Sequence, residues 1–381
     1  MRKNFFEDMD NLDEIIEMCV ARHEGKTTMT FNEMVEKFGL PIKPEALSRF
    51  CKYIGIYRDY LIRNKEEVNE QEILMEIQKE KRKMFDQRRE LNRTVTELAR
   101  MEGLMEMFEY HLENRVRIQA FEEERVLIKN PSNEREAVVF LSDIHYGIKV
   151  NNELNKFDTE ICKESFRKLY EDTVNVLTMH DTNKVTLLLG GDLVSGIIHT
   201  NLRLQQLEDV IDQVFGVADL IEEMAINLRA LGIEVKIVGT IGNHARVMAD
   251  KKQNLNSENF ERIIFKQLEK AGFSVLQESD VAIFKVAGND VVALHGHQTS
   301  PQKAFNYCVK RKKVIPSTIL MAHLHNDMRV DDGCVVIVNG SMVGTDAHAL
   351  DMGYHSQPHQ KIMIFEEGLG EICTFKSIFK R

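Results

Sequence analysis

Five apolar runs that end in aspartate, asparagine or histidine carry the clearest chemical meaning in this sequence. The first run, residues 137–141, is followed by Asp143 and His145, which alternation along a strand would place on the same side. The other four runs end in Asp192, in Asn243 with His244, in His295 with His297, and in His323 with His325. Carboxylates, one amide oxygen and several imidazoles are ligands that suit divalent metal ions, and the absence of thiolates argues against a structural zinc cage.

These residues outnumber the ligands that one ion needs. The set therefore predicts two divalent ions about 3.5–4 Å apart with a carboxylate between them, an arrangement that polarises a phosphoryl oxygen and lowers the pKa of a bound water. The imidazole-rich set favours Mn²⁺, with Fe, Ni and Zn as alternatives. A single D-x-H or a single histidine at a strand end is commonly structural, but five such ends in one chain indicate a metal site.

The elements that must position these residues alternate between strands and helices from residue 137 onward, which is typical of a layered α/β domain. Because ligands bind at the carboxyl ends of strands in such domains, the five ends are expected to converge. We predict strands within 137–143, 184–192, 234–243, 281–288, 290–297, 318–327 and 334–341, a hairpin over 361–375, and helices within 155–178, 203–229 and 257–271.

The ordered motifs D-x-H, G-D, G-N-H, H-G-H and H-x-H resemble those of the calcineurin-like metallophosphoesterase superfamily, over roughly residues 137–345. The resemblance implies an α/β (α+β) fold with a β-sandwich of two facing mixed sheets flanked by helices. It also implies the metal ligands: Asp143, His145 and His325 for the first ion, Asn243, His295 and His323 for the second, and Asp192 between them. His244 would then be catalytic and near the phosphate rather than a ligand.

The sequence also departs from the patterns of that superfamily. Ser195 and Ala245 stand where the protein Ser/Thr phosphatases carry acids, which argues against a phosphoprotein phosphatase and leaves no evident acid to orient His244. Ala322 replaces a glycine of the last motif, which is tolerable unless the backbone needs a positive φ. Arg246 is either a catalytic phosphate clamp or a surface ion-pair partner. Two further candidates for substrate contacts, His199 and His297, are as consistent with structural roles.

Residues 1–63 read as a small all-α domain of short helices. Thr30 followed by Glu33 is a capping-box signature, and Gly39 with Pro41 separates two helical stretches. A helix, a glycine-containing turn and a second helix are compatible with a DNA-binding helix-turn-helix or with a plain helical bundle.

Residues 64–128 predict one long charged helix with a narrow apolar stripe. Its stripe repeats every seven residues at Ile77, Met84, Leu91, Leu98, Met105 and Leu112. Such a helix either pairs with a second copy in a coiled coil, which we favour, or packs on its own globular domain. The segment 79–93 carries seven Lys or Arg against three acids and could follow a phosphate backbone, although a solvated helix face is also possible. Residues 129–136 read as a linker before a catalytic domain at 137–381.

Composition sets broad limits on the class of protein. The net charge of −10 gives no overall bias toward nucleic acid, so a polyanion site needs a local basic patch or metal ions. Six scattered cysteines without a C-x-x-C pair indicate reduced thiols in a cytoplasmic setting. No secretory leader and no membrane span are expected.

The functional hypothesis from sequence is a dinuclear-metal phosphoesterase that cleaves DNA with a metal-activated hydroxide and no covalent enzyme intermediate. The chain resembles most the Mre11/SbcD-like nuclease branch and phosphoesterases encoded by phages. An exonuclease or endonuclease acting as a homodimer is expected, in the cytoplasm of a bacterial host if the gene belongs to a phage. The alternatives are a nucleotide or other small-molecule phosphodiesterase or phosphatase, a phosphoprotein phosphatase, and a DNA-binding protein without activity.

Overall fold

The computed structural model of the chain divides into two compact units, Met1–Glu97 and Leu98–Arg381. It describes residues 12–40, 42–64, 70–115, 117–120, 126–198, 206–250, 254–255, 257–277, 280–331, 333–346, 349–350 and 355–381. This division does not test the finer boundaries expected at 63/64, 128/129 and 136/137, which stay predictions. None of the described helices is long and apolar enough to cross a membrane.

The first unit contains three helices, α1 (Leu12–His23), α2 (Phe31–Lys37) and α3 (Pro44–Asn64), around a small apolar core. The core consists of Ile15, Cys19, Met34, Leu40, Leu47 and Cys51. The predicted capping box is confirmed: the Glu33 N–H donates to Thr30 Oγ1 at 3.3 Å, and the Thr30 N–H donates to Glu33 Oε2 at 2.6 Å. Arg58 on α3 forms an ion pair with Glu24 at 2.8 Å.

One prediction about the cysteines is wrong. Cys19 on α1 and Cys51 on α3 form a disulfide, with their Cα atoms 4.7 Å apart, whereas all six thiols were expected to be reduced. The two residues are 32 positions apart, and only the packing of α1 against α3 brings them together. Cys162, Cys308, Cys334 and Cys373 are free thiols.

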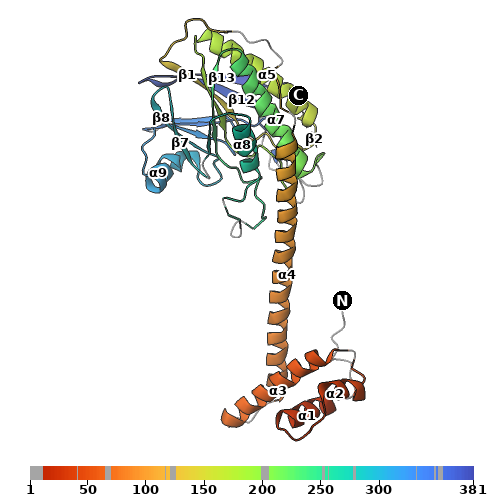
Figure 1. Ribbon diagram of the computed structural model, residues 1–381. Coiled ribbons are helices and arrows are strands. Elements are labelled where there is room, and N and C mark those ends of the chain that lie inside the picture. Colours follow the sequence, from red (N-terminus) through yellow and green to blue (C-terminus); the bar gives the residue numbers. More distant parts are fainter. Residues whose placement is uncertain are drawn as a thin grey trace. The chain divides into compact units, whose positions relative to one another are not determined.

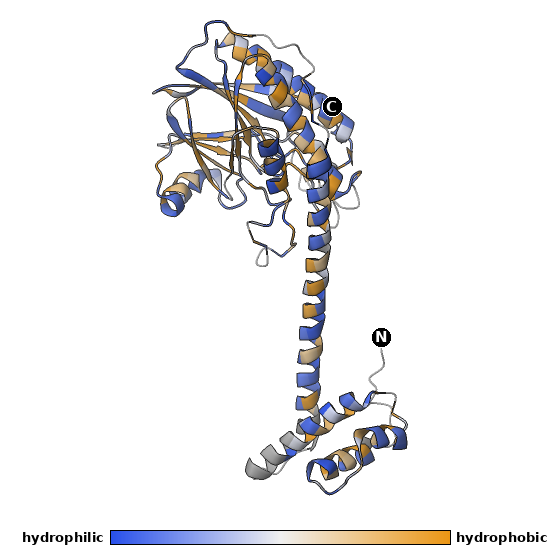
Figure 2. Cartoon of the chain, viewed as in Figure 1, coloured by the Kyte–Doolittle hydropathy of each residue, from blue (hydrophilic) through white to orange (hydrophobic). Residues whose placement is uncertain are grey.

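The predicted long helix is confirmed as α4 (Glu70–Asn114), whereas its pairing in a coiled coil stays a prediction. One of the two environments weighed for its apolar stripe, packing on the globular domain, occurs near the end of the helix. Near its end, Phe108 is buried in the core of the second unit, with Leu104 and Leu112 packed beside it. Further toward the start, Met84 and Leu91 are more than half exposed, at 57% and 63%. Figure 2 shows hydrophobic positions spaced between hydrophilic ones along α4.

The second unit is built on two mixed β-sheets (Figure 1). The larger has the order β13-β12-β1-β4-β5-β6 and the smaller the order β10-β11-β9-β8-β7. The larger contains β1 (Arg135–Leu141), β4 (Lys184–Leu189), β5 (Glu234–Gly239), β6 (Val275–Gln277), β12 (His359–Glu366) and β13 (Gly370–Ile378). The smaller contains β7 (Ala282–Val286), β8 (Asn289–Leu294), β9 (Thr318–Met321), β10 (Met328–Asp331) and β11 (Val335–Val338), and a short hairpin pairs β2 (Val150–Asn151) with β3 (Lys156–Phe157).

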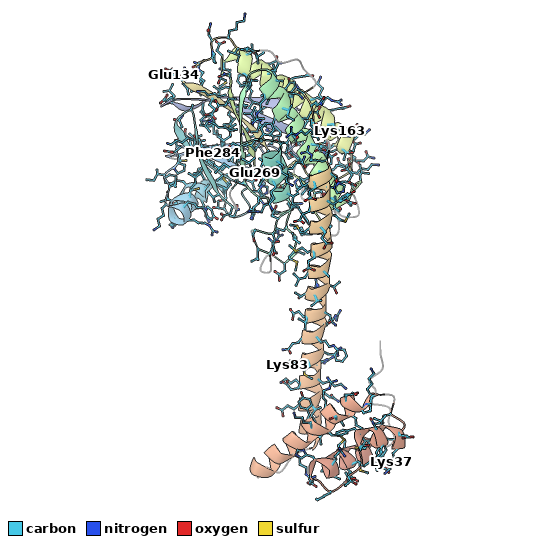
Figure 3. The ribbon with its side chains drawn as sticks, in the orientation of Figure 1. Lys37, Lys83, Glu134, Lys163, Glu269 and Phe284 are labelled. Atoms are coloured by element: carbon cyan, nitrogen blue, oxygen red, sulfur yellow. A yellow bond between two sulfur atoms is a disulfide. The ribbon has the colours of Figure 1, made fainter. Side chains whose placement is uncertain are left out.

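The two sheets face each other across a shared apolar core, because alternate residues of their strands are large and apolar. Phe140 and Leu188 of the larger sheet meet Val291, Leu320 and Phe284 of the smaller in one cluster, and Figure 3 labels Phe284 on β7. The other face of the larger sheet is covered by α5 (Thr159–Met179), α7 (Val210–Ala230) and α8 (Glu261–Lys270), and that of the smaller by α9 (Pro301–Lys312). The predicted β-sandwich flanked by helices is therefore confirmed.

The end of α4 is tied to α7 by charge as well as by packing. Arg115 lies 2.6 Å from Glu222 Oε2 and 3.2 Å from Asp219 Oδ1. Gln267 on α8 donates to Asp219 Oδ1 at 2.7 Å, so the three helices share one polar cluster. Residues 98–115 thus belong structurally to the second unit.

Candidate metal centre

The five strand ends that the sequence singled out meet at one edge of the sandwich. The parallel strands β1, β4 and β5 deliver Asp143, His145, Asp192 and Asn243 from the larger sheet, and β8 and β9 deliver His295, His323 and His325 from the smaller. Parallel strands end at the same edge, so two facing sheets place both sets of loops together.

The backbone at these positions is strained in a consistent way. Among the described residues, eight other than glycine have a positive φ, and five of these are Asp143, His145, Asp192, His323 and His325, with φ between 49° and 73°. Left-handed conformations at non-glycine residues cost on the order of 1 kcal/mol or more and collect at functional sites. Ala322 is not among the eight, which confirms that an alanine is tolerated in place of the glycine.

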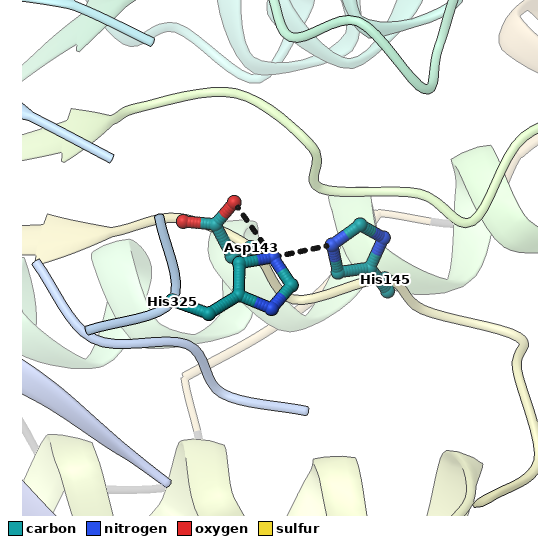
Figure 4. Close-up of side chains that lie close together, drawn as sticks. All are labelled: Asp143, His145 and His325. Carbon is teal, nitrogen blue, oxygen red and sulfur yellow. Dashed lines mark hydrogen bonds and ion pairs between the residues drawn. The ribbon is translucent and has the colours of Figure 1, made fainter. Parts of the chain in front are cut away.

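The first cluster consists of Asp143, His145 and His325 (Figure 4). His325 Nε2 lies 3.3 Å from both Asp143 Oδ1 and His145 Nε2. The other oxygen of the carboxylate, Asp143 Oδ2, accepts the backbone N–H of His323 at 3.1 Å, which ties the β1 and β9 loops together. Three ligand atoms of the right types therefore converge on one point.

The second cluster consists of Asp192, His295 and His323. His295 Nε2 lies 2.9 Å from Asp192 Oδ2, while its Nδ1 lies 2.8 Å from the carbonyl oxygen of Gly190. A backbone carbonyl at Nδ1 fixes the imidazole with Nε2 toward the cluster, which is the usual support of a metal-binding histidine. Asp192 also forms a third cluster with His145 and His244, so its carboxylate stands between the two sides of the site.

Burial and charge act against each other on the carboxylates and imidazoles of the site. Burial opposes ionisation of Asp192, but His295 and His244 hold its pKa well below the usual range. Burial would lower the pKa of His295, whereas the facing Asp192 raises it to about 10. Burial lowers the pKa of His323 to about 4, and His295 acts in the same direction. The result is a buried pair of anionic carboxylates surrounded by imidazoles.

The side chains present fit a pair of divalent ions. In each of the three clusters, the ligand atoms lie within 4.8 Å of one another. Asn243 Oδ1 is buried and accepts no hydrogen bond from any described residue. A buried acceptor without a donor costs about 1–3 kcal/mol, and a cation would satisfy it. The assignment of individual ligands stays a prediction.

The structure shows what orients His244. Its Nδ1 lies 3.3 Å from the backbone carbonyl oxygen of Ser195, and its backbone N–H donates to Asp192 Oδ1 at 2.8 Å. The hydroxyl of Ser195 is buried without a partner among the described residues. A backbone carbonyl therefore takes the place of the acid that the sequence lacks. Because every residue has a backbone carbonyl, the sequence alone could not indicate this contact.

Three further residues were predicted to contact the substrate: Arg246, His297 and His199. Arg246 Nε donates to the Asn243 carbonyl oxygen at 2.9 Å. Burial lowers the pKa of Arg246, while Asp192 and Asp250 act to raise it. The His297 ring centroid lies 5.6 Å from that of His295 and 6.2 Å from that of His323. His199 lies outside the described residues.

Glu261 is a supporting residue that the sequence did not reveal. It is fully buried at the start of α8, where Oε1 accepts the Leu193 N–H at 2.7 Å and Oε2 accepts the Gly242 N–H at 2.6 Å. One carboxylate thus holds the loops after β4 and β5 at the spacing that the site requires. Gly242 is needed in this arrangement because a Cβ there would overlap Asp192 Oδ1. The sequence signal that could have revealed Glu261 is an acid in the first turn of an amphipathic helix, on the face that carries the apolar residues.

Glu261 should make folding stability depend on pH. Burial first and then Asp192 raise the pKa of Glu261 to about 7 from 4.5. Below about pH 4.5 both states bind the proton; above it the unfolded chain loses the proton first, so this residue lowers stability until about pH 7. As the pH rises from 4.5 to 8, we expect the parent to lose up to about 3 kcal/mol of stability relative to Glu261→Gln. This change adds to a pH-independent loss in the variant, whose amide can accept only one of the two backbone N–H groups.

The measurement is urea unfolding of parent and Glu261→Gln protein at several pH values, after removal of metal by a chelator. Glu269→Gln, on an exposed side chain of the same helix, is the matched control and should follow the parent. A difference between parent and Glu261→Gln that does not change with pH would contradict the raised pKa.

A buried amide network holds the β1 loop in the same way. Gln360 Oε1 accepts the Ser142 N–H at 2.8 Å, and Asn339 donates to the Phe140 carbonyl oxygen at 2.9 Å and to Ser142 Oγ at 2.9 Å. Gln360 and Asn339 lie on β12 and after β11, and both are fully buried. The residue before Asp143 is therefore fixed from two other strands. Polar residues inside apolar runs were the signal for this network.

Comparisons with known proteins give a relative by sequence and several similar solved structures. No protein-family model matches the chain. The SPbeta prophage-derived uncharacterized protein YonJ of Bacillus subtilis (strain 168) is 24% identical over 265 residues, which are 64% of this chain and 64% of that protein, so less than two thirds of the relative's length is covered.

Among solved structures, a novel archaeal phosphodiesterase has a TM-score of 0.35 at 13% identity and covers 63% of this chain and 99% of its own. Zinc-bound Vps29 of Entamoeba histolytica has a TM-score of 0.30 at 14% identity, covering 64% and 99%. A predicted phosphoesterase of Streptococcus pneumoniae TIGR4 has a TM-score of 0.27 at 11% identity, covering 64% and 98%.

Proposed function

We propose that this chain hydrolyses phosphoester bonds with two divalent metal ions, Mn²⁺ before Fe, Ni or Zn, and that its substrate is DNA. The observation that carries the proposal is the position of Asp192. Its carboxylate belongs to one cluster with His295 and His323 and to another with His145 and His244. One carboxylate shared by two groups of imidazoles is the arrangement of a two-metal hydrolytic site.

The His and Asp residues divide between the two ions by the cluster to which each belongs, and Asn243 is added because its buried Oδ1 has no donor among the described residues. Asp143, His145 and His325 would hold one ion, Asn243, His295 and His323 the other, and Asp192 both. When bound, such a pair polarises a phosphoryl oxygen and lowers the pKa of water, so that an ester can be attacked directly. The left-handed backbone at five of these residues keeps the ligand atoms in place before substrate arrives.

His244 and Arg246 would act on the substrate itself. With Nδ1 held by the Ser195 carbonyl oxygen, His244 presents Nε2 to the site, 3.9 Å from Asp192 Oδ2. From there it can protonate the oxygen of the leaving group. Arg246 Nη1 is buried and has no acceptor among the described residues, so it is available to a non-bridging phosphate oxygen.

The proposal of DNA rests on the basic segment 79–93 of α4. The described side chains of this segment are exposed to solvent, and Figure 3 labels Lys83 among them. An exposed helix face with excess positive charge binds phosphate backbones through counterion release. The similarity to a prophage-derived protein fits a location in the cytoplasm of a bacterial host.

The test is a gel assay with end-labelled single-stranded and duplex DNA, Mn²⁺, the parent protein and Asp192→Asn. Shortening of DNA by the parent alone supports a nuclease, and the ladder distinguishes exonuclease from endonuclease action. DNA that stays intact, in a preparation that hydrolyses bis(p-nitrophenyl) phosphate, would rule out DNA and leave small nucleotide esters as the substrate.

We also propose that α4 pairs with α4 of a second copy. The heptad positions Ile77, Met84, Leu91 and Leu98 are 43–63% exposed, which is unusual for large apolar side chains at regular spacing. Leu91→Glu is expected to raise the dimer dissociation constant at least about 100-fold, because it puts an unpaired charge in the seam.

Light scattering across a concentration series measures this effect. The parent should have twice the mass of the chain, and Leu91→Glu the mass of one chain. Arg89→Glu, off the apolar stripe on the same exposed helix, is the matched control and should remain a dimer. A parent protein of single-chain mass at every concentration would refute the pairing.

A further inference from the structure

A cavity with a volume of about 330 Å³ lies beside the second cluster. Its lining includes Gly242, which precedes Asn243, and His297, whose ring lies 5.6 Å from that of His295. The remaining walls come from the β5 loop, the β8 loop and α9. Ligand pockets begin at about 300 Å³, so this cavity has room for one compact organic group next to the metal centre.

Two hydrogen-bond donors in the cavity wall have no acceptor. Arg246 Nη1 and Gln298 Nε2 are both buried without a partner among the described residues. Gln298 Oε1 accepts the Gly296 N–H at 3.2 Å, so its amide is anchored by the oxygen and offers its NH₂ group. Because unpaired buried donors cost about 1–3 kcal/mol each, the wall fits a ligand that carries acceptor atoms.

The rest of the wall is aromatic and electrically balanced. Tyr307 on α9 contributes a ring, and the Arg311 guanidinium lies 5.7 Å from its centroid. Asp280 neutralises this arginine at 2.8 Å and is also 3.6 Å from Lys312. The wall away from the metal centre thus offers an aromatic ring, the neutral amide of Gln298 and an arginine that is paired with a carboxylate. Such a surface recognises a flat, uncharged group with acceptor atoms, as a nucleobase is.

We propose that this cavity binds the nucleoside attached to the phosphate that the metal centre cleaves. The base lies against Tyr307, Gln298 Nε2 donates to an acceptor of the base or sugar, and Arg246 Nη1 donates to the phosphate at the inner end. The inference rests on the proposed function and narrows the substrate to nucleotide esters. The nucleoside can belong to a DNA strand or to a free nucleotide, since both present the same groups.

The experiment compares kcat/KM for the p-nitrophenyl ester of thymidine 5′-phosphate with kcat/KM for methyl p-nitrophenyl phosphate, which has no nucleoside, with Mn²⁺. Tyr307→Leu and Gln298→Leu are each expected to lower the ratio of the two values about 10-fold, the order of a lost stacking or hydrogen-bonding contact. The matched control is Gln302→Leu, which changes an exposed glutamine on α9, the helix that carries Tyr307. This variant should keep the ratio of the parent.

Inhibition separates the two sources of nucleoside. Thymidine 5′-monophosphate and a thymidine dodecamer should both inhibit the parent and lose about 10-fold in affinity in Tyr307→Leu, and the tighter of the two identifies the source. An unchanged ratio in both variants, or no inhibition by either nucleotide, would overturn the inference. If the parent hydrolyses neither ester at saturating Mn²⁺, the proposed function itself fails, which is a separate result.

Discussion

Asp192→Asn is expected to lower kcat/KM for bis(p-nitrophenyl) phosphate by at least about 10³-fold, since several kcal/mol of transition-state stabilisation depend on the metal pair. The reason is the position of this side chain in two clusters at once. An amide keeps the size of the carboxylate but removes the negative charge that faces His295 at 2.9 Å and would otherwise face two cations. The variant should therefore bind both ions more weakly than the parent does, and not only one of them.

Metal content of dialysed protein and steady-state hydrolysis together measure this effect. Asp212→Asn, an exposed aspartate in the first turn of α7, is the matched control and should keep both metal and rate. If Asp192→Asn retains two ions per chain and a normal rate, the shared carboxylate has been assigned wrongly.

His244→Asn should have a different signature, because His244 is proposed to move a proton and not to hold metal. We expect kcat to fall about 10²–10⁴-fold, the usual contribution of a general acid, while the metal content stays that of the parent. The loss should be smaller for p-nitrophenyl esters than for DNA, since p-nitrophenolate leaves without protonation. Loss of an ion from His244→Asn would instead make this residue a ligand, as its place in the cluster with His145 and Asp192 allows.

Ser195→Ala provides the control for His244. Ser195 holds the imidazole through its backbone carbonyl oxygen, and its hydroxyl is buried with no partner in the described part of the chain. Removing the hydroxyl should leave kcat within about twofold of the parent. A large loss in Ser195→Ala would show that the hydroxyl acts on the substrate or on His244.

The ligand positions could be predicted from sequence because strand ends leave a strong local signal. An apolar run that is followed at once by a polar residue, as before Asp143 or His295, marks the end of a buried strand. Because the strands are parallel, their ends then lie at one edge of the sheet. All the predicted strands and all three helices predicted within 155–178, 203–229 and 257–271 are found, with ends displaced by several residues. The left-handed backbone at the ligands left no such signal, since Asp and His also occur in ordinary conformations.

Other features depend on contacts that a linear pattern does not encode. The helix α9 was not predicted because Lys303, Asn306 and the run Lys310–Lys313 interrupt its apolar spacing, although Pro301 marks its start. Because α9 was not predicted, neither the position of Tyr307 nor the cavity that it lines could be predicted. The Cys19–Cys51 disulfide depends on how α1 packs against α3. The apolar stripe of α4 has one spacing throughout, yet Leu112 packs against the core of the second unit while Leu91 is exposed.

The most direct test of the central claim is a titration of Mn²⁺ into chelator-stripped protein, with the initial rate of bis(p-nitrophenyl) phosphate hydrolysis as the readout. The two-ion site predicts no hydrolysis without metal and a rate that reaches its plateau at two ions per chain. A protein that binds Mn²⁺ but hydrolyses no phosphodiester at any concentration of metal would contradict the account, as would a rate that survives complete removal of metal.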